Sequence, residues 1–109
     1  MATISLCMIV KNESAVLARC LDSIADLMDE IIIVDTGSTD NTKEIAAQYT
    51  SRIYDFKWTS DFSATRNFSF SKATMEYIYT ADADEILDDA NRERFLRLKG
   101  ALLPEIEIN

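Results

Sequence analysis

Short apolar runs that alternate with helix-patterned segments constrain the fold of this chain more than any other feature. Ile31–Val34 is a continuous β-branched run, which is typical of a strand covered on both faces. Ile4–Val10 is a second apolar run and is followed by polar residues, as expected for a buried strand. Between the two runs, from Ser14 onward, apolar residues from Val16 to Met28 recur at helical spacing. The first part of the chain therefore predicts a strand–helix–strand unit.

The same alternation continues along the rest of the chain. The patterns predict a helix at about 41–49, a strand at 52–56, a helix at 62–73, a strand at 76–80 and a helix at 90–103. We expect an interruption of the last helix near Gly100 and its end at Pro104, and Glu105–Ile108 alternates like the start of another strand. Helices inserted between strands imply right-handed crossovers, so the predicted class is α/β with an open, mainly parallel sheet and flanking helices.

Length and charge limit the classes of protein that this chain can represent. With 109 residues, 48% of them hydrophobic, the chain suffices for one domain with one core. No apolar run approaches the roughly 20 residues of a transmembrane helix, and the first residues lack the basic segment of a signal peptide. A net charge of −8 argues against binding to a nucleic-acid backbone. We expect a cytoplasmic protein with no transmembrane segment and no nucleic-acid partner.

The scarcity of histidine and cysteine excludes several kinds of active site. The sequence contains no histidine, which rules out Ser–His triads, histidine metal sites and imidazole proton shuttles. Cys7 and Cys20 lie in apolar patterns, and their spacing fits neither a redox motif nor a zinc site. We therefore expect both to be reduced thiols in the core.

Three acidic residues follow the predicted strand that ends at Thr80. Asp82 and Asp84 are separated by one residue, and Glu85 comes next. In an extended backbone, side chains at i and i+2 point to the same side, so the two aspartates can converge on one cation. Carboxylate oxygens suit Mg²⁺ or Mn²⁺. The local sequence leaves a second interpretation open, a solvated acidic turn that leads into a helix.

Two further polar clusters also come directly after predicted strands. Asn12 and Glu13 follow the first strand, and Asp35 follows the second at the head of a turn-rich segment. Because the carboxyl ends of parallel strands share one edge, where open α/β sheets bind ligands, the clusters predict a single site. Glycines occur only at positions 37 and 100, which rules out a Rossmann dinucleotide fingerprint and a P-loop.

Four motifs occur in a fixed order along the chain. They are Cys7–Glu13 (CMIVKNE), Ile33–Thr42 (IVDTGSTDNT), Asp61–Asn67 (DFSATRN) and Asp82–Glu85 (DADE). Together they strongly resemble family 2 glycosyltransferases of the GT-A fold, most of all the bacterial branch with a CMIVKNE start and a DADE metal motif. The resemblance covers nearly the whole chain, and its specificity comes from the combination.

The resemblance implies a site for a nucleotide-diphosphate sugar, most commonly a UDP-sugar. The matching nucleotide-sugar-binding positions are Val10, Asn12, Glu13, Asp35, Arg66, Asn67 and Asp82. Asp82 and Asp84 match the pair that handles Mg²⁺ or Mn²⁺. The implied reaction is a metal-dependent, inverting transfer of the sugar to an acceptor that the sequence does not identify. A divalent cation acts in such a reaction as a Lewis acid on the diphosphate leaving group.

The family pattern also implies what this chain lacks. Family members continue beyond the DADE segment, and their later half carries the acceptor site and the carboxylate that deprotonates the acceptor. No residue here matches that general base, so we expect the catalytic base outside the chain. Residues 1–109 are expected to form a single domain, a truncated N-terminal part of a larger glycosyltransferase domain that is inactive alone.

Several of these residues also have a purely structural interpretation. Asn12 and Glu13 fit the start of the first helix, Asp35 fits a turn that holds loop amides, and Arg66 fits a pair with a surface acid. Glu85 fits either support of the metal ligands or an ordinary start to the next segment.

Three other positions are expected to be structural, and two other functions compete. Asp40 is expected to cap a helix, and Trp58 and Phe62 are expected to be core or loop anchors. One competing function is a non-catalytic α/β nucleotide-binding or interaction module. The other is an aspartic protease, because Asp35 begins an Asp-Thr-Gly-Ser sequence, but the helical sequence that follows disfavours it.

Overall fold

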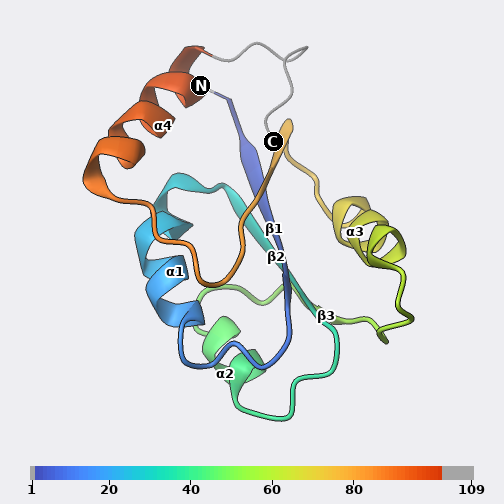
Figure 1. The fold of residues 1–109 in the computed structure, drawn as a ribbon. Helices are drawn as coiled ribbons and strands as arrows, with labels where there is room; N and C mark the ends of the chain where they lie inside the picture. Colours follow the sequence, from blue (N-terminus) through green and yellow to red (C-terminus); the bar gives the residue numbers. More distant parts are fainter. Residues whose placement is uncertain (1, 102–109) are drawn as a thin grey trace.

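The computed structural model describes residues 2–101, which form a four-stranded parallel sheet with helices on both faces (Figure 1). The strands are β1 (Ile4–Val10), β2 (Glu30–Asp35), β3 (Ile53–Asp55) and β4 (Tyr77–Thr80). The helices are α1 (Leu17–Ile24), the short 3₁₀ helix η1 (Ala25–Leu27), α2 (Thr42–Ala46), α3 (Phe62–Ser71) and α4 (Asp89–Ala101). The predicted α/β class is confirmed, and the aspartic protease, which needs an all-β body, is excluded.

The strand order places a crossover point in the middle of the sheet. The order is β3-β2-β1-β4, so the chain first builds the sheet outward from β1 and then returns to add β4 on the other side of β1. In doubly wound sheets, ligands bind outside the carboxyl ends of the strands at such a reversal. Val10 is level with Asp35, and Asp35 is level with Asp55, so three strands end at the same edge.

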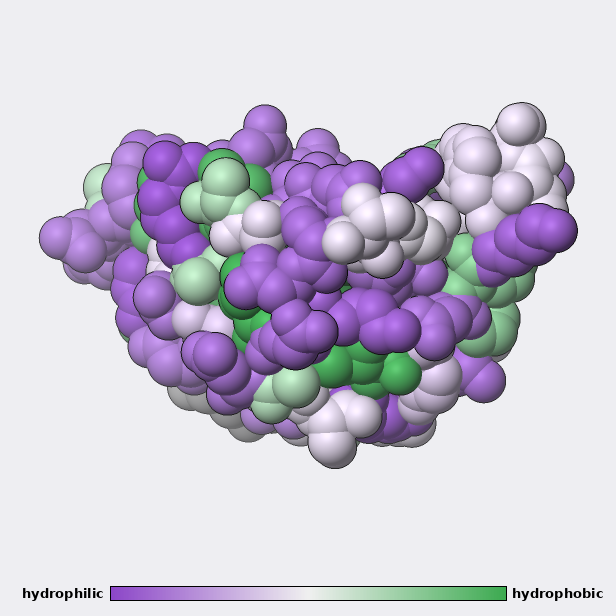
Figure 2. Space-filling model, turned by 90° about the horizontal axis from the view of Figure 1, so that it is seen from below, coloured by the Kyte–Doolittle hydropathy of each residue, from purple (hydrophilic) through white to green (hydrophobic). Residues whose placement is uncertain are grey.

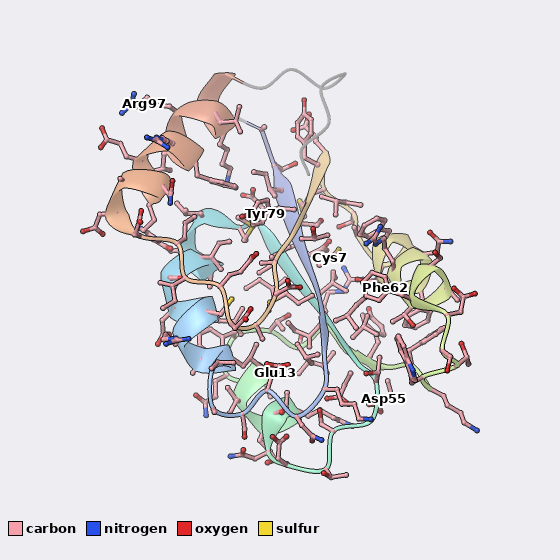
Figure 3. The ribbon with its side chains drawn as sticks, in the orientation of Figure 1. Cys7, Glu13, Asp55, Phe62, Tyr79 and Arg97 are labelled. Atoms are coloured by element: carbon pink, nitrogen blue, oxygen red, sulfur yellow. The ribbon has the colours of Figure 1, made fainter. Side chains whose placement is uncertain are left out.

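Both faces of the sheet are covered, which explains the continuous apolar runs. Leu6 and Met8 of β1 belong to the core cluster that α1 covers. Cys7, between them, points to the opposite face and joins a cluster with Phe68 of α3 (Figure 3). A third, smaller cluster at the amino end of the sheet contains Phe95 of α4. Within residues 2–101, no helix is long and apolar enough to cross a membrane.

The strands lie where the sequence predicts them, whereas the helix boundaries differ. The first helix begins at Leu17 and not at Ser14, because residues 14–16 form a turn. The second helix ends at Ala46 and not near Tyr49. After Ala46, the N–H groups of Gln48 and Tyr49 bond to carbonyls three residues earlier, as in a turn. Gly100 lies inside α4, so the expected interruption there is wrong. The predicted stop at Pro104 and the strand at 105–108 fall outside the described residues.

Predictions for four side chains have mixed outcomes. Cys7 and Cys20 are buried free thiols, as predicted. Trp58 and Phe62 are 44% and 49% exposed, so of the two expected roles, core residue or loop anchor, the first is wrong. On the surface of α3, the guanidinium of Arg66 lies over the Phe62 ring, 4.8 Å from the ring centroid. The ring therefore contacts a charged side chain of its own helix.

Candidate functional site

The carboxyl ends of the strands form one face of the molecule, at the lower end of Figure 1. Figure 2 shows this face directly, and it is largely hydrophilic, with small apolar areas between polar side chains. Glu13 and Asp55, from the connections after β1 and at the end of β3, both lie at this end in Figure 3. The three polar clusters predicted from the sequence follow β1, β2 and β4, so the parallel arrangement brings them to a common edge.

Asp35 combines a structural contact with an unused oxygen. The side chain is only 2% exposed. Its Oδ1 accepts the backbone N–H groups of Gly37 and Ser38, each at 2.8 Å. Gly37 has φ +121°, which side-chain-bearing residues rarely adopt, so glycine allows this turn. The second oxygen, Oδ2, is buried and has no hydrogen-bond partner among residues 2–101. Such an orphaned acceptor is rare in proteins and calls for an explanation.

The electrostatics of Asp35 favour its ionised form. Burial alone raises the pKa of this carboxyl, but hydrogen bonds from Ser38 and Gly37 outweigh burial, and the positive charge of Lys43 adds to them. The net result is a lowered pKa. Near neutral pH, Asp35 therefore presents one negatively charged, partnerless acceptor oxygen at the edge of the sheet.

Asn12 ties the loop after β1 to the loop after β2. Its backbone is in the left-handed region, with φ +53°, which asparagine tolerates better than most residues. Its N–H donates to Ser38 Oγ at 2.9 Å, and its Oδ1 accepts the N–H of Thr39 at 2.7 Å. Sequence reasoning missed Ser38 and Thr39 as partners; their position in a dense turn sequence was the available signal. Asn12 thus has a bracing role in addition to any role toward a ligand.

A second set of bonds joins the same two loops near α2. The N–H of Glu13 donates to Thr42 Oγ1 at 2.9 Å, and Thr42 is fully buried. Asp40 accepts the N–H of Thr42 at 3.0 Å and also its hydroxyl, and it accepts the N–H of Ser14 at 3.4 Å. Asp40 therefore satisfies the first backbone donor of α2, although the N-cap position itself is Asn41, whose side chain makes no capping bond. The Glu13 carbonyl accepts from Val16 and Leu17, at 3.1 and 2.9 Å, and so also helps to start α1.

The DADE segment exposes both of its aspartates on the surface. Ala81 and Ala83 are buried in the main core cluster, whereas Asp82 and Asp84 are exposed. Residues 83–84 form a turn, so the extended backbone on which the expectation of a converging pair rests does not continue through Asp84. Among the described residues, no hydrogen bond or ion pair engages either carboxylate. The two side chains thus remain available as oxygen ligands for a hard cation.

The negative charge of the DADE segment helps to raise the pKa of a neighbouring thiol. Cys20 of α1 lies beneath the segment, and its Sγ is 3.6 Å from the Asp82 carbonyl oxygen. Burial is the largest cause that raises the pKa of Cys20 to about 11, followed by the negative charges of Glu85, Asp84 and, more weakly, Asp82. A divalent cation would neutralise this local charge. Within residues 2–101, no group of three or more acidic or cysteine side chains is arranged to hold a metal ion. The aspartate pair therefore fits a cation that takes its other ligands from a bound molecule.

The remaining predicted residues occupy less distinctive positions. Val10 is 2% exposed, and its carbonyl accepts the N–H of Thr36 at 3.1 Å, so it forms part of the floor under the site. Arg66 and Asn67 are exposed on α3, which covers the opposite face of the sheet from α1. In the described part of the chain, no hydrogen bond or ion pair joins them to the other candidate residues. Arg66 stacks on the ring of Phe62, and no acid within residues 2–101 forms an ion pair with it.

Comparisons of the sequence with known proteins give consistent similarities. The profile of the family described as Glycosyl transferase family 2 matches residues 5–100. Glycosyltransferase SunS of the SPbeta prophage in Bacillus subtilis is 37% identical over 103 residues, which cover 92% of this chain and 24% of SunS. A TPR repeat-containing protein from Synechococcus elongatus is 47% identical over 87 residues, or 80% of this chain and 22% of that protein. The chain thus spans about a quarter of the length of these relatives.

Solved structures with a similar fold include a synthase that has been crystallised with a sugar nucleotide. Glucosyl-3-phosphoglycerate synthase from M. tuberculosis superposes with a TM-score of 0.67 and 26% identity, over 78% of this chain and 36% of that one. It has also been crystallised with Mg²⁺ and UDP, and with Mn²⁺ and UDP-glucose. TarS residues 1–349 from S. aureus give a TM-score of 0.72 at 20% identity, over 88% of this chain and 32% of that one, a similarity of fold.

Proposed function

This chain belongs to glycosyl transferase family 2, and from that premise we propose that it is the donor-binding part of a glycosyltransferase. The carboxyl edge of its sheet binds a nucleotide-diphosphate sugar, a UDP-sugar in the simplest case, together with Mg²⁺ or Mn²⁺. The observation that carries the proposal is the buried, ionised Oδ2 of Asp35, which has no partner within the described residues at the edge where such sheets bind ligands.

Recognition of the nucleoside is assigned to Asp35. A carboxylate oxygen without a partner accepts hydrogen bonds only, so it selects N–H or O–H groups of a base or ribose. Oδ1 is already occupied by two backbone N–H groups, which fixes the carboxylate plane and pre-orients Oδ2. Asn12 and Glu13 hold the adjacent loop, and Val10 forms the floor beneath it. A rigid acceptor loses little entropy on binding, which favours selectivity.

Binding of the diphosphate is assigned to Asp82 and Asp84 through the cation. Two anionic side chains repel a diphosphate unless a cation lies between them, and within residues 2–101 no third acidic or cysteine side chain completes a metal site with them. A hollow of about 100 Å³ lies against Asp82 and Glu85. When bound, Mg²⁺ or Mn²⁺ supplies Lewis-acid stabilisation of the departing nucleoside diphosphate. The similar synthase crystallised with UDP and these cations supports the same ligand set here.

Other parts of the reaction follow from family membership. We propose that Arg66 and Asn67 line the nucleotide site from α3, and that the sugar is transferred with inversion. Because the chain spans 22% and 24% of two of its relatives, we assign the acceptor site and the general base to sequence beyond these 109 residues. Residues 1–109 then form one truncated domain that acts in the cytoplasm and transfers no sugar alone.

Calorimetric titration of UDP into the chain tests this proposal. With Mn²⁺ or Mg²⁺ present, we expect saturable binding that EDTA abolishes. The double variant Asp82→Asn/Asp84→Asn should weaken binding by about tenfold or more, because it removes both proposed metal ligands. Glu93→Gln, an exposed charge change on α4, serves as the control and should leave the affinity unchanged. Equal binding of UDP in EDTA and by the double variant would refute the proposed donor site.

A further inference from the structure

We propose that Glu85 is a positioning residue that fixes Asp82 and Asp84 in their cation-binding arrangement by closing the 82–85 turn. This inference rests on the function proposed above and adds a residue to it. Glu85 makes two contacts with the backbone of Asp82. Its Oε2 accepts the Asp82 N–H at 3.2 Å, and its own N–H donates to the Asp82 carbonyl at 3.0 Å. The pair of bonds fixes the backbone on both sides of the Asp82 side chain.

Packing holds the two alanines of the turn but gives little support to the part that carries Glu85 and Ile86. A cavity of about 340 Å³ lies between α1 and the loop that follows β4. Cys20, Ser23 and Ile24 line it from α1, and Glu85, Ile86 and Leu87 line it from the loop. Only Ala81 and Ala83 of the segment are buried in the core, and Ile86 is 51% exposed. Leu87 packs against the core at the far end of the loop, so between Ala83 and Leu87 hydrogen bonds contribute more to the conformation than apolar contacts do.

Helix α1 provides anchors at both ends of the loop. Cys20 Sγ donates a weak bond to the Asp82 carbonyl at 3.6 Å. Ser23 Oγ accepts the N–H of Leu87 at 3.1 Å and donates to the Cys20 carbonyl at 2.7 Å. Between these two anchors, Glu85 supplies the contact that sets the backbone of the metal-binding pair. Loss of the Glu85 side chain would therefore release the Asp82 N–H, while the backbone bond from residue 85 and both anchors to α1 remain.

This arrangement distinguishes Glu85 from a third metal ligand. One of its carboxylate oxygens is used by a backbone N–H, and the role requires a hydrogen-bond acceptor and not a charge. Glutamine retains an acceptor oxygen at the same position, whereas alanine removes it. Both substitutions remove the same negative charge. The comparison of Glu85→Ala with Glu85→Gln therefore isolates the hydrogen bond from the electrostatic attraction of the cation.

The test measures Mn²⁺ affinity by electron paramagnetic resonance in the presence of saturating UDP. We expect Glu85→Ala to bind Mn²⁺ about tenfold more weakly than Glu85→Gln, which is the scale on which outer contacts affect metal affinity. Amide exchange of Asp82 without metal gives a second readout, and it should speed up in Glu85→Ala but not in Glu85→Gln. Glu93→Gln controls for the loss of a distant charge, and circular dichroism confirms that each variant is folded.

The outcomes separate the inference from the function on which it rests. Equal Mn²⁺ affinities for Glu85→Ala and Glu85→Gln, in a protein whose wild type binds Mn²⁺ with UDP, would overturn the positioning role alone. Protection of the Asp82 amide that is identical in the two variants would overturn it as well. Failure of the wild type to bind Mn²⁺ with UDP would instead overturn the proposed donor site.

Discussion

Replacement of Asp35 by asparagine separates the two contacts that this side chain can make. Asparagine keeps an acceptor oxygen for the N–H groups of Gly37 and Ser38, which Oδ1 accepts at 2.8 Å in the wild type. It also removes the negative charge and places an NH₂ group where the partnerless Oδ2 lies. The loop after β2 should therefore keep its conformation with weaker hydrogen bonds to residue 35. A hydrogen-bond donor of the ligand, however, would face the NH₂ group of asparagine instead of an acceptor oxygen.

The expected magnitudes follow from the bonds that change. Hydrogen bonds to a charged group contribute about 1.5–3 kcal/mol and neutral ones about 0.5–1.5 kcal/mol, so the two loop bonds lose about 2 kcal/mol together. Relief of the cost of burying a charge that is only 2% exposed offsets part of this loss. We expect the free energy of unfolding to fall by about 1–2 kcal/mol. Loss of one charge-assisted bond to the nucleoside weakens UDP binding by roughly 10- to 150-fold.

Urea unfolding at pH 7 measures the first quantity, and calorimetry with UDP and Mg²⁺ measures the second. Asp55→Asn is the matched control, because Asp55 is the register partner of Asp35 on β3 but its side chain is 72% exposed and paired with Lys43. We expect the control to leave UDP affinity within about twofold of the wild type, since an exposed ion pair contributes little. Wild-type affinity for UDP in Asp35→Asn would refute the role of Oδ2.

The pH dependence of stability gives the same variant a second test. The pKa of Asp35 is lowered in the folded protein from its ordinary value of 3.8. Its contribution to stability is therefore complete above that value and is lost as the pH falls through the lower, folded-state pKa. Wild-type protein should lose stability more steeply than Asp35→Asn below about pH 4. Parallel stability curves for the two proteins in that range would contradict the lowered pKa.

Three further predictions concern stability and reactivity. Glu30→Ala should lower the free energy of unfolding by about 3 kcal/mol, because Glu30 is a nearly buried acid whose ion pair with Arg52 spans 2.5 Å. A decrease of less than about 1 kcal/mol, measured by urea unfolding, would contradict this prediction. Asn12→Ala should cost about 1–2 kcal/mol through its positive φ and the lost bond to Thr39, and Asn12→Gly should cost less; the reverse order would exclude backbone strain. Cys20, with a pKa of about 11, should react slowly with iodoacetamide at pH 8 until the protein unfolds, and equal rates before and after unfolding would show that it is accessible.

The sheet was predictable because its strands are covered on both faces. Ile31–Val34 has no polar residue to interrupt it, so the pattern locates the strand without any tertiary information. Helix ends were less predictable because distant contacts set them. Tyr49 continues the apolar pattern of the second helix, but α2 ends before it, at Ala46. The Tyr49 hydroxyl instead contacts α1, at 2.5 Å from Asp22 Oδ1 and 3.3 Å from the Ala18 carbonyl. Such a contact has no local signal in the sequence.

The candidate site was predictable in location but not in its internal bonds. The strand pattern placed Asp35 at the end of one strand and Asp82 and Asp84 directly after another, and parallel strands end at one edge. The left-handed backbone of Asn12 and its bond to Thr39 depend on the register of two loops, which no local pattern encodes. Glu30 illustrates the same limit away from the site. It accepts from Ser5, Arg52 and Thr74, which are far apart in the sequence, and so ties together the amino end of the sheet.

Paramagnetic broadening by Mn²⁺ tests the central claim, that the carboxyl edge of the sheet binds a cation together with a nucleotide. Mn²⁺ would be added at substoichiometric ratio to ¹⁵N-labelled protein saturated with UDP. We predict that amide signals of residues 82–85 broaden first, then those of 10–13 and 35–38, while signals of α4 persist. Broadening centred on the acidic groove at the opposite end of the sheet, lined by Asp26, Asp29 and Glu30, or equal broadening throughout the chain, would contradict the account.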